Sequence, residues 1–141
     1  MEQDFNLLSR IYSDTSSLSK TMNCILPKVI NPNMRKVLIG QINECDKINS
    51  DAKCAISNLG KKIKNNPFLN LSAAMNSKVN TIANTSDSAV AEFIIKEVNA
   101  DIIDITKTIN ASQNSSPESY ELGRKLIRKG EECISSIKIF L

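Results

Sequence analysis

The chain of 141 residues contains no histidine and no tryptophan. Histidine is the commonest metal ligand and the usual general base at neutral pH, so its absence excludes most familiar metal centres and catalytic dyads. The four cysteines lack any C-x-x-C spacing, and we expect reduced thiols that mostly pack in the core. No glycine-rich phosphate loop and no G-x-S-x-G motif occurs. We therefore predict no cofactor and no enzymatic activity.

Long apolar runs are also missing from the sequence. No stretch of about 18 consecutive apolar residues is present, so we expect no membrane span. The acidic start MEQDF lacks the hydrophobic segment of a secretory signal, and the formal net charge of +3 is too small to indicate nucleic-acid binding by itself. These features favour a cytoplasmic protein with one domain, residues 1–141, that is long enough to bury a core.

Apolar residues recur at helical spacing along the chain, and strand signals are weak. We expect a first helix over about 4–26, ended by Pro27, and a second helix over about 32–59. Gly60 follows at the position of a C-cap glycine. The second helix has an apolar period of about 3.5 residues, which is typical of helices that pack at a shallow angle.

The second half of the chain continues the helical pattern. The sequence predicts a short helix over 71–82, a third long helix over 87–111, and a last helix that Ser116 caps and Pro117 begins. The links after the first and third long helices are short, whereas the link over 61–86 can cross the bundle from end to end. We predict an all-α four-helix bundle with ferritin-like connectivity, in which this long crossover contains the short extra helix. An up-and-down bundle with a lid is the alternative.

Four stretches of the sequence carry a resemblance to other proteins: the K-x-N-T stretch Lys78–Thr81, the Ala-Glu pair at 91–92, the IIDITK run at 102–107 and the terminal helix EECISSIKIFL. In these features the chain resembles small uncharacterised ferritin-like proteins of spore-forming Firmicutes, over most of its length. The resemblance implies a four-helix ferritin-like bundle with a domain of unknown function. The family pattern has a histidine and a glycine where this chain has Ala89 and Asp101, so any use of that histidine does not carry over.

The predicted third long helix carries Glu97, Asp101 and Asp104 on one flank of its core face. Like charges at this spacing repel each other, so a compensating group is expected. A hard divalent cation is one candidate, because such ions accept ligand sets made only of oxygen. A di-iron centre is excluded, because it needs E-x-x-H on two helices. The first helix, moreover, offers only Asp14, which we place off its apolar stripe.

The basic stretch GRKLIRKG at 123–130 is the other candidate, and we prefer it. If the last two helices are antiparallel, Asp104 lies level with Arg124, and Asp101 lies level with Arg128. The sequence therefore predicts a seam of interhelical ion pairs between these four residues, and no metal. Glutamates interrupt the basic stretch and no aromatic residues interleave with it, which argues against a nucleic-acid interface.

Three further features complete the prediction. Gly123 and Gly130 stand one heptad apart on the last helix, and we expect a neighbouring helix to approach closely there. Gln41 interrupts an apolar stripe, as polar residues that fix the register of a core do. Ile103 lies on the polar side of its helix, which makes a homodimer plausible.

Our interpretation is a non-enzymatic structural or interaction protein, with a link to sporulation or stress that rests on the resemblance. The alternative is a protein that binds a divalent metal or a small ligand through Glu97, Asp101 and Asp104.

Overall fold

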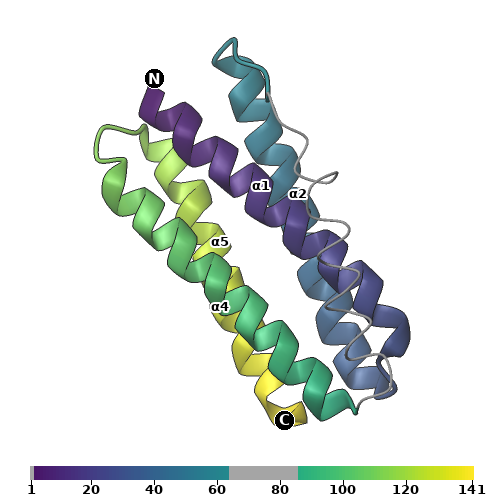
Figure 1. Ribbon diagram of the computed structural model, residues 1–141. Coiled ribbons are helices and arrows are strands. Elements are labelled where there is room, and N and C mark those ends of the chain that lie inside the picture. Colours follow the sequence, from purple (N-terminus) through teal and green to yellow (C-terminus); the bar gives the residue numbers. More distant parts are fainter. Residues whose placement is uncertain (1, 64–85) are drawn as a thin grey trace.

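The computed structural model of the protein describes residues 2–63 and 86–141. Within these ranges it has no strand and four long helices: α1 (Glu2–Ile25), α2 (Pro32–Asn58), α4 (Asp87–Ala111) and α5 (Pro117–Ile137), with short 3₁₀ helices η1 (Leu26–Lys28) and η2 (Lys138–Phe140) (Figure 1). The predicted all-α class with four long helices is thereby confirmed. The short helix predicted over 71–82 and the crossover that would contain it lie outside the described residues.

The helix ends follow local signals in the sequence. The side chains of Asn31, Ser86 and Ser116 cap α2, α4 and α5 by accepting hydrogen bonds from backbone N–H groups in the first turn. Proline follows Asn31 and Ser116 directly, at the first helical position, where its missing N–H costs nothing. At the end of α2, Gly60 adopts a φ of 73°, and Lys61 N donates to Ile56 O at 3.3 Å. This is a Schellman motif with glycine in the left-handed position.

Hydrogen bonds between the helix ends show which way each helix runs along the bundle. The Asp87 carboxylate, at the start of α4, accepts from the N–H groups of Ile30 and Asn31 at 3.0 and 2.8 Å, just before α2 begins. At the opposite end, Asp4 accepts from Ser116 N at 2.6 Å, where α5 begins. Helices α2 and α4 therefore start at the same end of the bundle, and α1 and α5 start at the other end (Figure 1).

The four helices pack as two antiparallel hairpins, α1–α2 and α4–α5 (Figure 1). Between the hairpins, α2 packs on α5 and α1 packs on α4. The predicted close approach at the glycines of α5 is confirmed. A Cβ at Gly123 would lie 3.0 Å from Ile109 Cδ1, and one at Gly130 would lie 3.1 Å from Ile102 Cδ1.

The hydrophobic core consists of two clusters that follow each other along the bundle. The larger cluster lies toward the end where α2 and α4 begin and includes Met22, Met34, Leu38, Ile94 and Ile137. The smaller lies toward the other end and includes Leu7, Ile11, Ile48, Ile105 and Leu126. None of the helices in the described ranges combines the length and hydropathy that are needed to cross a bilayer.

Candidate functional site

The acidic flank of α4 faces α1 and meets a further carboxyl group there. Glu97, Asp101 and Asp104 of α4 are joined by Asp14 of α1, and we call these four side chains the acid layer. The charges of Asp101 and Asp104 act on Asp14 and disfavour its ionisation. The acid layer thus spans the contact between the two hairpins.

One basic side chain enters the acid layer from α1. Arg10 Nε lies 2.9 Å from Asp104 Oδ2, in an ion pair whose side chains are 55% and 31% exposed. Asp14 lacks such a partner for its second oxygen: Oδ2 is buried and accepts no hydrogen bond from the part of the chain that the structure describes. An ionised Asp14 would therefore carry charge on an oxygen with neither water nor a donor beside it.

The surroundings raise the pKa of two of these carboxyl groups. Burial raises the pKa of Asp14 from 3.8 to about 9, the neighbouring Asp104 and Asp101 carboxyl groups raise it further, and the charge of Arg10 acts to lower it. Burial also raises the pKa of Asp101 from 3.8 to about 7, and the neighbouring charges of Glu97 and Asp104 add to this effect. Both carboxyl groups therefore keep a proton to a higher pH than an exposed aspartate does.

The ion-pair partners differ from the predicted seam. Asp104 pairs with Arg10, whereas Arg124 lies over the ring of Tyr120, 5.3 Å from its centroid. Across residues 2–63 and 86–141, neither Arg124 nor Arg128 forms an ion pair with Asp101 or Asp104. The cause is the rotation of α4. Its isoleucine side faces the glycines of α5, which turns the acidic flank toward α1.

The alternative prediction, a metal site of Glu97, Asp101 and Asp104, gains no support from the geometry. No group of three histidine, cysteine, aspartate or glutamate side chains in the described ranges is arranged to hold a metal ion. The carboxylates of Glu44 and Glu132 form ion pairs with Lys129 of α5, at 4.0 and 3.5 Å.

The buried thiols are poorly suited to nucleophilic chemistry. All four cysteines are free, and Cys45 and Cys133 are buried, whereas Cys24 is partly buried and Cys54 is exposed. Burial raises the pKa of Cys133 to about 12. Burial and the charge of Asp101 raise the pKa of Cys45 well above its ordinary value. Because the thiolate is the reactive form, both core thiols are inert at neutral pH.

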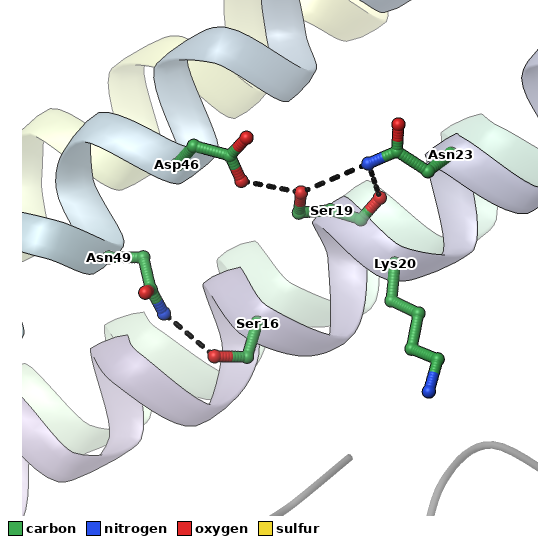
Figure 2. A pocket seen from close by; sticks show the side chains of 6 residues that line it. All are labelled: Ser16, Ser19, Lys20, Asn23, Asp46 and Asn49. Carbon is green, nitrogen blue, oxygen red and sulfur yellow. Dashed lines mark hydrogen bonds between the residues drawn. The ribbon is translucent and has the colours of Figure 1, made fainter.

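A second polar region lies between α1 and α2, where six polar side chains line a pocket of about 510 Å³ (Figure 2). They are Ser16, Ser19, Lys20 and Asn23 of α1, with Asp46 and Asn49 of α2. Their donors bind the helices to each other: Ser19 Oγ donates to Asp46 Oδ1 at 2.6 Å, and Asn49 Nδ2 donates to Ser16 Oγ at 2.7 Å. In Figure 2 these side chains face one another, while Lys20 extends away from them. The pocket is thus lined by a polar seam that holds the hairpin together.

Arg10 was not among the predicted site residues, and the predicted position of Asp14 was wrong. We expected Asp14 off the apolar stripe of its helix, but it lies three residues after Ile11 and four before Leu18, and both of these are buried. That spacing on a helix puts Asp14 on the same face as its two apolar neighbours. Including Ile11 in the stripe would have identified Asp14 as a core-facing acid.

Comparisons of the chain with protein-family models, curated proteins and solved structures give no match. The function therefore has to be inferred from the geometry of the molecule itself. The two regions with the most distinctive chemistry are the acid layer between α1 and α4 and the polar pocket between α1 and α2.

Proposed function

We propose that the protein is a non-enzymatic helical bundle that acts through its surface, as a structural or interaction module of the cytoplasm, and that its first partner is a second copy of itself. The carboxylates that pair with basic side chains and the buried, unreactive thiols support a role without catalysis. The common starting end of α2 and α4 supports ferritin-like connectivity, because an up-and-down bundle would begin these two helices at opposite ends. The resemblance to small ferritin-like proteins of spore-forming Firmicutes supports the same connectivity and a link to sporulation or stress.

The exposure of Ile103 carries the proposal of self-association. Ile103 is 48% exposed on the outer face of α4, where a large aliphatic side chain gains nothing from the core. The exposed residues one turn away on either side are Asn99, Ala100, Thr106 and Lys107. Apart from Lys107, this strip of α4 is uncharged and suits an isologous contact, in which the same face of two copies meets across a two-fold axis. Apolar surface that is open to solvent in the monomer would be buried there.

Size-exclusion chromatography with light scattering, run over a range of protein concentrations, tests this proposal. We expect the protein to elute as a dimer, and Ile103→Asp to elute as a monomer. Asn43→Asp is the matched control, because it adds the same charge at an exposed position of α2, outside the proposed interface. A chain that is monomeric at every concentration would refute self-association. A dimer that Ile103→Asp leaves intact would refute this face as the interface.

A further inference from the structure

The acid layer occupies the gap between the two hydrophobic clusters of the core. On α1, Asp14 lies between Ile11 of the smaller cluster and Leu18 of the larger one. On α4, Asp101 lies between Val98 and Ile105, which again belong to different clusters. At this level the contact between α1 and α4 is made by carboxyl groups where the core on either side is apolar. The stability of the contact between the hairpins therefore depends on the charge of these carboxyl groups.

The Asp14 carboxyl group lies where ionisation is costly. Its Oδ2 is buried and accepts no hydrogen bond from the described residues. The Arg10 guanidinium, one turn earlier on α1, lies 2.9 Å from Asp104 Oδ2 and is thus paired with α4. A charge on Asp14 would therefore face the acids of α4 without a donor of its own, whereas a proton on Asp14 removes that charge.

We propose that the folded bundle keeps a proton on Asp14, where α1 meets the acids of α4, and that loss of this proton to solvent weakens the contact between the two hairpins of the bundle. The charged groups that act on Asp14 come from the same two helices: Arg10 from α1, and Asp101 and Asp104 from α4. Packed against these helices, α2 and α5 contribute the thiols of Cys45 and Cys133. They also contribute Lys129, which lies between Glu44 and Glu132. The contact between the two hairpins is thus expected to be stronger in acid and weaker in alkali.

The sign of the effect follows from proton linkage. Unfolding exposes Asp14 to water, where it ionises near its ordinary pKa of 3.8, whereas the folded protein keeps the proton up to a pKa of about 9. Between these values unfolding releases a proton, so stability falls as pH rises. Asp14 alone then raises the unfolding equilibrium constant by up to about tenfold for each pH unit in this window.

Urea unfolding of the full chain, followed by circular dichroism across this pH window, tests the proposal. We expect the plot of the logarithm of the unfolding constant against pH to be shallower in Asp14→Asn by about one proton. Asparagine keeps the shape of aspartate and, like the protonated side chain, carries no charge, so the variant retains the fold. Asp51→Asn, at an exposed position of α2, is the control and is expected to keep the wild-type slope. Asp101→Asn should lose slope below about pH 7, which gives a second, independent reading.

Two results would overturn the proposal. Parallel curves for the wild type and Asp14→Asn would mean that no proton is held at Asp14. The second result concerns cations. If millimolar Mg²⁺ or Mn²⁺ stabilises the wild type at pH 8 and this effect is lost in Asp14→Asn, the acid layer holds a cation in place of the proton. An unfolding curve that neither ion moves is the expected outcome.

Discussion

Replacing Gly130 by alanine is expected to destabilise the bundle, although alanine is the better helix former. Gly130 lies inside α5, where alanine would gain about 1 kcal/mol of intrinsic helix propensity. The new Cβ would, however, lie 3.1 Å from both Cδ1 and Cγ1 of Ile102 and 3.2 Å from Cγ1 of Val98. The substitution therefore combines a favourable effect on helix propensity with an unfavourable steric effect.

The steric effect is expected to dominate at Gly130. Three carbon atoms of α4 stand too close to the new methyl group, and one belongs to Val98, a fully buried residue that cannot turn away. Overpacking of this kind costs about 1–3 kcal/mol, so we expect a net loss of about 1 kcal/mol in the free energy of unfolding. At Gly123 the atom at 3.0 Å is the terminal Cδ1 of Ile109, which is only partly buried, and the loss should be smaller.

Gly40 provides the matched control for this measurement. It also lies inside a helix, α2, but a Cβ there would meet no atom within 4 Å. Gly40→Ala should therefore show the propensity gain alone, about 0.5–1 kcal/mol. The assay is urea unfolding of both variants and the wild type, followed by far-UV circular dichroism. If Gly130→Ala stabilises the protein as much as Gly40→Ala does, then α4 and α5 do not approach closely at Gly130, and the packing described above is wrong.

Three further predictions concern the thiols and the polar contacts. In the folded protein a maleimide should modify Cys54 rapidly and spare Cys45 and Cys133 until urea is added, which mass spectrometry can follow; modification of all of them at equal rates would contradict their burial. Asn49→Ala should lower the free energy of unfolding by about 1–2 kcal/mol, because its Nδ2 donates to three acceptors on α1 at 2.7–3.0 Å. An unchanged urea midpoint would show that the polar seam adds nothing to stability. Burial acts to raise the pKa of Asp4, but hydrogen bonds from the start of α5 outweigh burial and lower that pKa. Asp4→Asn should therefore destabilise the protein at pH 7. The destabilisation should disappear in acid, because the wild-type carboxylate is then protonated. A destabilisation that is independent of pH would refute this assignment.

The helices and their ends were predictable because their signals are local. Pro32 and Pro117 at first helical positions, Ser116 as a cap and Gly60 as a left-handed C-cap are each set by a few neighbouring residues. The spacing of the glycines on α5 also predicted the close approach of another helix, since glycine inside a helix is costly unless something packs against it.

The composition of the acid layer was not predictable, because it depends on how each helix is rotated about its own axis. Counting along two antiparallel helices shows which residues are level, and so placed Asp104 at the height of Arg124. It does not show which flank faces the neighbour. The contact between Ile102 and Gly130 turns the acids of α4 away from α5 and toward Arg10 and Asp14 of α1.

The retention of a proton by Asp14 is tested most directly by a carboxyl ¹³C NMR titration of Asp14 in the folded protein. We predict that the Asp14 resonance stays in its protonated position at pH 7 and titrates with a midpoint near pH 9. A midpoint near pH 4, as in an exposed aspartate, would mean that Asp14 is ionised in the folded bundle and that no proton is held where α1 meets α4.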